Sequence, residues 1–78
     1  MTIKVYSTQS CPYCVTLKNF LKEKGFEFDD IDVTFEKEKQ DEMIEKSGQM
    51  GVPVIDIDNQ IIIGFDREKI VKALNITE

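Results

Sequence analysis

Residues 3–14, Ile-Lys-Val-Tyr-Ser-Thr-Gln-Ser-Cys-Pro-Tyr-Cys, decide the fold of this chain. They begin with a run of strand-forming residues and end with the two cysteines of the chain, Cys11 and Cys14. A helix-like run then continues to Lys24. A Cys-x-x-Cys sequence at a strand-to-helix junction in a small α/β chain is typical of a redox-active dithiol. The sequence therefore predicts thiol–disulfide exchange as the chemistry that the rest of the chain serves.

Hydrophobic patterns beyond this stretch predict the element order β-α-β-α-β-β-α. Gly25 and Gly48 end the first two helices, because glycine readily adopts the left-handed conformation that closes a helix. Thr34 and Asp66 are the expected N-caps of the second and third helices, and a two-residue turn at 58–59 predicts an antiparallel hairpin. The expected strands are residues 3–6, 26–33, 53–57 and 60–63, and the expected helices are residues 12–24, 35–47 and 67–74.

These elements predict one α/β domain over residues 1–78, with a four-stranded mixed sheet flanked by three helices. Because crossover connections are right-handed, we expect the first three strands to be mostly parallel and the hairpin to add an antiparallel edge. The first and third helices are expected to share one face of the sheet. The second helix, nearly all polar from Glu36 to Glu42, is expected to be peripheral. The expected core residues of the three helices are Leu17, Phe20 and Leu21, then Phe35, Met43 and Ile44, and then Ile70, Val71 and Leu74.

The composition limits the kinds of partner. The formal net charge is −5, which argues against broad binding to nucleic acids or to anionic membranes. No histidine is present, so the chain offers no imidazole base and no imidazole metal ligand. The N-terminal residues do not resemble a secretion signal, and the apolar run at 61–63 is far too short to span a bilayer. Two cysteines without such a signal indicate a reducing compartment, so we expect a cytoplasmic protein.

The spacing of the cysteines predicts different roles for them. Only a thiolate attacks a disulfide, and a helix N-terminus stabilises negative charge through unpaired N–H groups and the helix dipole. Cys11 is expected at that terminus with an exposed sulfur, whereas Cys14 lies one turn deeper on the same face. We therefore expect Cys11 to attack the substrate and form a mixed disulfide, which Cys14 then resolves.

Other interpretations of the same residues have to be weighed. A structural disulfide at this spacing closes a very small loop and stabilises little. A zinc site needs about four ligands, which one chain with two cysteines and no histidine does not supply. An iron–sulfur cluster bridging two chains stays open. Asp29, Asp30 and Asp32 are read as a solvated strand end rather than a metal site, so we expect no bound metal. Tyr13, between the cysteines, either packs against a bound peptide or is a half-covered loop residue.

Two further stretches are candidates for the site. Val52-Pro53 opens a strand, and its peptide bond is either trans, as in most X–Pro bonds, or cis. A cis bond would turn the backbone of Val52 outward to pair with an extended substrate. Gly64-Phe65-Asp66 precedes the last helix, whose free N–H groups either hold a carboxylate or form an ordinary N-cap.

Together these residues resemble the glutaredoxin family over nearly the whole chain. Cys11-Pro12-Tyr13-Cys14 matches the dithiol motif of the family, and Val52-Pro53 stands where the family has Thr-Val-cis-Pro. Gly64-Phe65-Asp66 stands where the family has a glycine, a small residue or cysteine, and an aspartate. The resemblance implies a thioredoxin-like fold and a cis Pro53. It also implies a monomeric enzyme that reduces protein disulfides and glutathione mixed disulfides, with glutathione as co-substrate and no bound cofactor.

The resemblance also implies a groove for glutathione. Its members by position are Tyr13, Val52, Pro53, Gly64, Phe65 and Asp66, with Thr8, Gln49 and Arg67 as secondary members. Thr8 stands where the family often has a lysine, Gly51 where it has threonine, and Arg67 where an acidic residue is expected. Gly64-Phe65 further resembles the glutaredoxin-like electron donors of ribonucleotide reductase, which thioredoxin reductase reduces. That class is the alternative interpretation.

Overall fold

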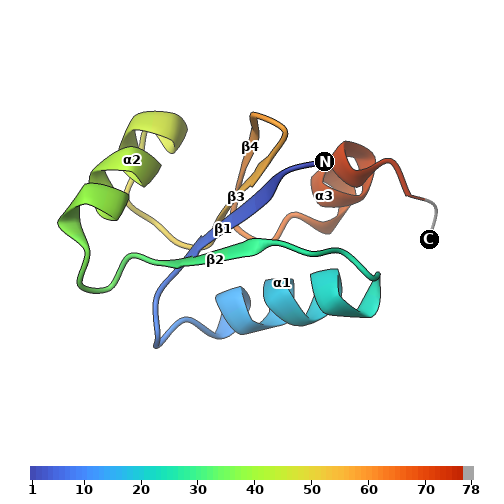
Figure 1. Cartoon of the computed structure of the whole chain (residues 1–78), viewed down its shortest axis with the longest axis horizontal. Coiled ribbons are helices and arrows are strands. Elements are labelled where there is room, and N and C mark those ends of the chain that lie inside the picture. Colours follow the sequence, from blue (N-terminus) through green and yellow to red (C-terminus); the bar gives the residue numbers. More distant parts are fainter. Residues whose placement is uncertain (77–78) are drawn as a thin grey trace.

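The computed structural model describes residues 1–76 and has the predicted element order (Figure 1). Its strands are β1 (Ile3–Ser7), β2 (Asp29–Asp32), β3 (Val54–Ile57) and β4 (Gln60–Ile63), and its helices are α1 (Pro12–Glu23), α2 (Lys37–Ser47) and α3 (Arg67–Leu74). The four strands form one mixed sheet in the order β2-β1-β3-β4. Within the described residues, no helix has the length and apolar character needed to cross a membrane.

The direction of β3 corrects the expected topology. β1 is parallel to β2, but β3 is antiparallel to β1, with Tyr6 opposite Val54. Ser7 pairs with Asp32 at the same end of the sheet, so the chain leaves β2 and enters β3 at one end. The right-handed crossover rule governs connections between parallel strands, and it therefore does not apply to the connection through α2.

The main core lies between the sheet and the two helices α1 and α3, which confirms that these helices share one face. Residues from both helices and from β1, β3 and β4 are buried together. Phe20 of α1 and Phe65 before α3 meet edge to face, with ring centroids 5.7 Å apart. The buried members of this core are Ile3, Val5, Leu17, Phe20, Leu21, Ile55, Ile57, Ile62, Ile70 and Leu74.

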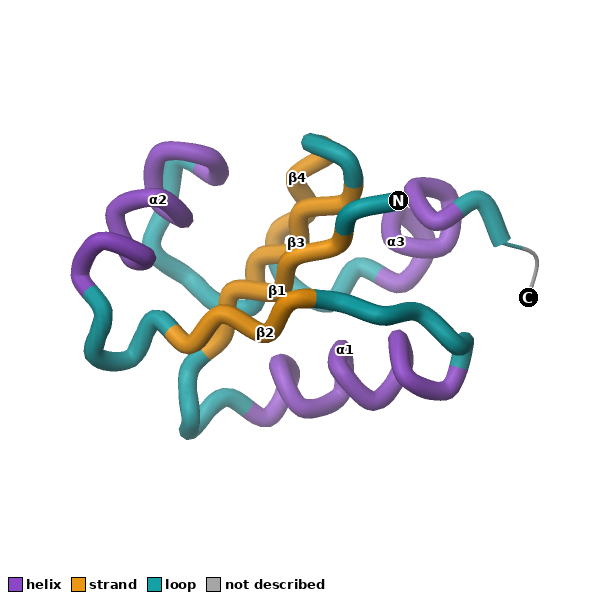
Figure 2. Tube along the Cα trace, viewed as in Figure 1, coloured by secondary structure: helices purple, strands orange, loops and turns teal. Residues whose placement is uncertain are grey.

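The opposite face of the sheet is covered by α2, and Figure 2 shows α1 and α2 separated by the strands. Met43 is the buried residue of α2, and it packs in a small cluster with Tyr6, Val33 and Val54. A polar network adds to this contact. Lys46 Nζ donates to Asp56 Oδ2 at 2.9 Å and to the Tyr6 hydroxyl at 3.1 Å. α2 is thus held to the sheet by hydrogen bonds as much as by apolar packing.

The start of α2 differs from the prediction. α2 begins at Lys37 behind Glu36, and Phe35, expected in the core, is 83% exposed. Thr34 does not cap the helix: the N-cap is Glu36, and the Thr34 hydroxyl accepts the N–H of Gln9 at 3.2 Å. The N–H of Thr34 donates to Asp32 Oδ1 at 2.8 Å in a local turn. This turn uses residues that the predicted helix needed for its first hydrogen bonds.

The second strand is also shorter than expected. β2 spans Asp29–Asp32, not residues 26–33. The N–H of Phe26 instead donates to the Leu21 carbonyl at 2.9 Å, which closes the C-terminus of α1. Gly25 has the left-handed φ of +80° that this helix end requires. The segment before β2 therefore belongs to the end of α1 and to the packing of its phenylalanines against the main core.

Candidate active site

Cys11 occupies the N-cap position of α1. Its backbone is extended, and Pro12 follows as the first helical residue. The Cys11 sulfur accepts a hydrogen bond from the N–H of Cys14 at 3.2 Å. The sulfur thus takes the place that a serine or aspartate oxygen takes in an ordinary N-cap. An N–H donor and the positive end of the helix dipole therefore both lie at Cys11 Sγ.

Cys14 lies one turn deeper and is completely buried, whereas Cys11 is partly exposed; both thiols are free. Burial, followed by a hydrogen bond with Cys11, raises the pKa of the Cys14 thiol to about 11. A hydrogen bond from the Thr8 backbone and the charge of Lys18 oppose this rise but do not cancel it. The site therefore contains one partly exposed thiol and one buried thiol, joined by the hydrogen bond from the Cys14 N–H to Cys11 Sγ.

The Val52–Pro53 peptide bond is cis, as the resemblance implied. Pro53 is fully buried and Val52 is half-buried. The Pro53 carbonyl accepts the N–H of Gly64 at 2.8 Å, which ties this loop to the segment before α3. Among residues 1–76, no group is hydrogen-bonded to the N–H or carbonyl of Val52. Both groups are available to a ligand.

The segment before α3 is shaped by a turn and a cap. Gly64 has a left-handed φ of +76°, which a residue with a side chain rarely adopts. Phe65 packs against Phe20, and Asp66 is the N-cap of α3, accepting the N–H of Lys69 at 3.2 Å. The predicted cap is confirmed.

The three secondary residues lie in different surroundings. Thr8 borders the dithiol, and its backbone bonds to Cys14. The Arg67 guanidinium lies over the Phe20 ring, 5.3 Å from its centroid, so it packs on the side of α1. Gln49 is folded back on its own loop, where its amide donates to the Gly51 carbonyl at 3.0 Å and accepts the Gly51 N–H at 2.6 Å.

The contact between Gln49 and Gly51 was not predicted from the sequence. A Cβ atom added at Gly51 would come within 2.7 Å of Gln49 Oε1. The amide of Gln49 therefore occupies the space that a side chain at position 51 would need. A side chain at position 51 would displace the Gln49 amide from its hydrogen bonds within this loop.

Sequence reasoning also missed Met50 and the groove beside it. A groove of about 310 Å³, here called the α2-side groove, runs from Thr8 and Ser10 to Met50 and Val52. Met50 is 76% exposed, although it is a large apolar residue next to the cis-proline loop. Its place in the sequence, just before Gly51-Val52-Pro53, was the available signal. The groove brings the dithiol loop and the Val52 loop into one site.

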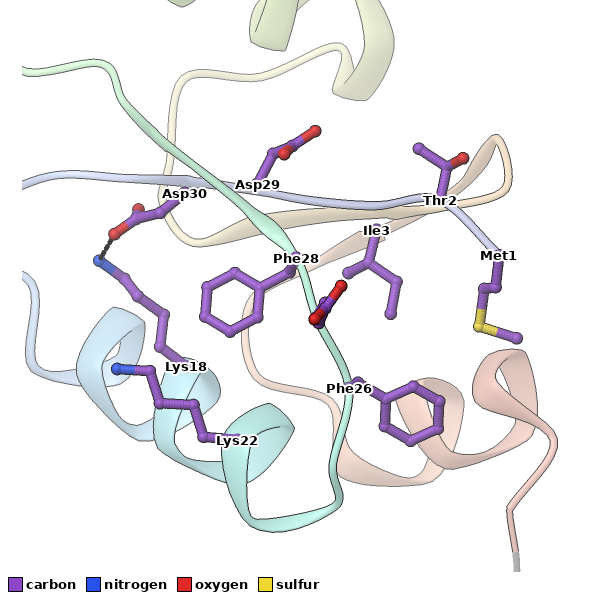
Figure 3. Close-up of a pocket in the computed structure, with 10 residues that line it drawn as sticks. Met1, Thr2, Ile3, Lys18, Lys22, Phe26, Phe28, Asp29 and Asp30 are labelled. Atoms are coloured by element: carbon purple, nitrogen blue, oxygen red, sulfur yellow. Dashed lines mark hydrogen bonds and ion pairs between the residues drawn. The ribbon is translucent and has the colours of Figure 1, made fainter.

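A wider cavity, of about 720 Å³, lies elsewhere between α1 and the segment that leads into β2 (Figure 3). Its lining includes Phe26 and Phe28, together with an ion pair between Lys18 Nζ and Asp30 Oδ2 at 3.0 Å. It contains neither cysteine and none of the predicted site residues. The α2-side groove, in contrast, is lined by Thr8 and Val52, so the wider cavity is not the candidate active site despite its size.

Comparison with known proteins identifies relatives of this chain. The family model described as Glutaredoxin matches residues 3–62. A glutaredoxin-like 8.6 kDa protein in the rubredoxin operon of Clostridium pasteurianum is 44% identical over 92% of this chain and 96% of its own. Glutaredoxin 3 of Escherichia coli K12 is 39% identical over 82% and 77%. The crystal structure of a glutaredoxin from Archaeoglobus fulgidus superposes with a TM-score of 0.84 at 25% identity, over 95% and 86% of the two chains.

Proposed function

Since the chain belongs to the glutaredoxin family of thiol–disulfide oxidoreductases, we propose that it reduces protein disulfides and glutathione mixed disulfides with glutathione as co-substrate. We propose further that residues 1–78 act as a single monomeric domain in the cytoplasm.

The proposed reaction begins at Cys11. Its thiolate attacks one sulfur of the substrate disulfide, forms a Cys11–substrate disulfide, and releases the other half as a thiolate. Cys14 then loses its proton and attacks Cys11 Sγ, which releases the second half and leaves a Cys11–Cys14 disulfide. Two electrons have passed from the dithiol to the substrate. Two glutathione molecules restore the dithiol and leave as glutathione disulfide.

One observation carries the assignment of roles, namely the unequal placement of the two sulfurs on α1. Cys11 is partly exposed, and its sulfur accepts the N–H of Cys14 at the start of α1. Cys14 is buried, and burial is the main reason for its raised pKa. An incoming disulfide can therefore reach Cys11 but not Cys14. Cys14 can react only with a partner already attached to Cys11.

The surrounding loops support binding of a peptide-like thiol. The free N–H and carbonyl of Val52 can pair with an extended chain, as in recognition by strand addition. The N-terminus of α3, capped by Asp66, lies at the other side of the cis-proline loop through the Gly64–Pro53 hydrogen bond. Tyr13 is 68% exposed and can cover a bound ligand. These features support Tyr13, Val52, Pro53, Gly64, Phe65 and Asp66 as the glutathione groove.

A second candidate differs only in the reductant. The α2-side groove has no charged lining residue, and the amide of Gln49 is used within its loop, so an anionic glutathione finds few partners there. These observations favour an electron donor that is reduced by thioredoxin reductase and serves, for example, ribonucleotide reductase.

The experiment that separates the two candidates compares reductants. The protein and a glutathione mixed-disulfide peptide are assayed with NADPH, once with glutathione plus glutathione reductase and once with thioredoxin reductase. The proposal expects rapid turnover in the first assay and little in the second. Turnover with thioredoxin reductase alone would overturn the glutathione proposal. Omitting the protein, and replacing it with Cys11→Ser, give the background rates.

A further inference from the structure

The α2-side groove starts at the loop that precedes the dithiol and extends away from it. It runs from Thr8 and Ser10, which precede Cys11, past Thr34 to Ile44 of α2, and returns along Met50 and Val52. Val52 is the residue whose backbone is free to pair with a substrate. A substrate chain held at Val52 with its sulfur at Cys11 therefore has neighbouring side chains at the mouth of this groove.

The chemistry of the groove is unusual for this chain. Nine residues line it and none is charged, although 32% of the residues of the chain are charged. Five of the nine are apolar, namely Val33, Met43, Ile44, Met50 and Val52. A charged group entering the groove would lose water without meeting an opposite charge, whereas an apolar group would gain from burial.

We infer that the α2-side groove is a specificity subsite that takes an uncharged, apolar side chain of a protein substrate, from a residue adjacent to the disulfide cysteine. This inference rests on the proposed function, because it assumes that the disulfide is attacked by Cys11. Its volume of about 310 Å³ is at the lower limit of ligand pockets, which suits one large side chain better than a whole small peptide.

The exposed rim of the groove supports this occupant. Met50 at the rim is largely exposed, and Phe35 follows Thr34 directly in the chain and is also exposed. An apolar side chain that covers Met50 would remove apolar surface from water, which is favourable. Methionine also adapts to apolar side chains of different shapes. In this inference, the occupant is a side chain of the substrate protein, and Met50 packs against it.

The test uses a series of disulfide peptides that differ at one residue beside the cysteine. That residue is leucine, phenylalanine, aspartate or lysine, and kcat/KM is measured for each peptide. The inference expects the leucine and phenylalanine peptides to be favoured over the aspartate peptide by about tenfold, which corresponds to about 1.4 kcal/mol.

Substitutions at the rim test whether the groove is responsible. Met50→Lys is expected to raise kcat/KM for the aspartate peptide and to reduce the preference for leucine about tenfold, because it supplies the missing cation. Met50→Leu is expected to keep the preference. Gln60→Lys makes the same charge change in the exposed residue after the β3–β4 turn, at the opposite end of the sheet, and is expected to change nothing.

The outcomes separate this inference from the proposed function. If the wild-type protein reduces all four peptides at equal kcat/KM, the subsite is wrong while the exchange chemistry stands. If Met50→Lys and Gln60→Lys shift the preference equally, the effect is one of total charge and the groove is not the subsite. If no peptide is reduced by the dithiol with any reductant, the proposed function itself has failed. A gain of activity on the aspartate peptide also shows that the variant is folded.

Discussion

Cys11 and Cys14 are three residues apart in one helix but have opposite surroundings. The Cys11 sulfur caps the helix and accepts an N–H, while the Cys14 sulfur is fully covered. The spacing alone predicted this asymmetry, because three residues advance a helix by nearly one turn along the same face. The complete burial of Cys14 needed the structure, since it depends on residues brought to the helix by the fold, such as Thr8, whose backbone bonds to the sulfur.

The first prediction concerns the pH dependence of the resolving step. Because burial raises the pKa of Cys14 to about 11, its thiol is almost entirely protonated near neutrality. Release of substrate from a preformed Cys11 mixed disulfide should therefore accelerate from about pH 6 to about pH 9, since each unit increases the thiolate fraction about tenfold. Quenched single-turnover experiments measure this rate, and Cys14→Ser provides the background. A rate that is flat over this range would contradict the burial argument.

Asp66 gives a second prediction at the residue scale. As the N-cap of α3 it accepts the N–H of Lys69, so Asp66→Ala should lower the free energy of unfolding by about 1 kcal/mol. Asp66→Asn should keep the cap, because asparagine is an equally good N-cap residue, while removing the charge. Urea denaturation measures the stability of both variants. Equal losses in both would show that the charge, and not the cap, stabilises α3.

Asp66→Asn also separates capping from ligand binding. If the proposed glutathione groove includes the charge of Asp66, this stable variant should raise the KM for a glutathione mixed disulfide. The exposed residue Glu68 lies in the first turn of the same helix, and Glu68→Gln is the matched control for charge. An unchanged KM in Asp66→Asn would show that the charge of Asp66 does not bind glutathione and that Asp66 serves only as the N-cap of α3.

At the scale of elements, α2 depends on polar contacts more than α1 and α3 do. Asp56 on β3 is nearly buried, and its carboxylate accepts from Lys46 and from the N–H of Asn59. The Tyr6 hydroxyl accepts from Lys46 and donates to Glu42 at 2.5 Å. Few apolar residues on α2 face the sheet, so this network determines where the helix lies, and with it one wall of the α2-side groove.

The third prediction tests this network. Lys46→Met leaves the Asp56 carboxylate buried without its cation, which should reduce the free energy of unfolding by about 2 kcal/mol. Lys37→Met makes the same change at an exposed position of α2 and should have little effect. Chemical denaturation measures the free energy of unfolding of the two variants. Equal stabilities would mean that the network contributes nothing beyond surface charge.

The network also predicts a loss of stability in alkali. The hydrogen bond to Asp56, then that to Tyr6, raises the pKa of Lys46, and burial, then the bond to Glu42, raises the pKa of Tyr6. For both groups the folded pKa exceeds the unfolded value, near about 10. Their contribution is therefore complete below that pH and is lost as pH rises through the folded values. The alkaline loss should be smaller in Lys46→Met, because one of the two groups is gone.

The elements show which structural features local sequence determines. α1, α3 and the β3–β4 hairpin were predicted well, because Gly25 and the turn at 58–59 act through their own backbones and Asp66 acts on a backbone N–H three residues away. The direction of β3 was predicted wrongly, since it depends on where a long connection returns to the sheet. The exposure of Phe35 was also missed, because a turn at Asp32 competes with the start of α2.

At the scale of the whole molecule, exposed apolar side chains gather at the end of the sheet that carries the dithiol. Tyr13 lies between the two cysteines, Phe35 follows the end of β2, Met50 precedes the Val52 loop, and Ile63 ends β4 opposite Val54. The motifs of the candidate site were predictable because each is a short run of sequence. The gathering of single residues at one end was not predictable, because four separate segments contribute to it.

The central claim is that Cys11 alone meets the substrate and Cys14 alone releases it. The most direct measurement is mass spectrometry of Cys14→Ser and Cys11→Ser after incubation with an excess of a disulfide peptide. The account predicts that Cys14→Ser accumulates one peptide adduct on Cys11, while native Cys11→Ser stays unmodified because its Cys14 is buried. An adduct on Cys14 of folded Cys11→Ser, formed as fast as that on Cys11 of Cys14→Ser, would contradict it.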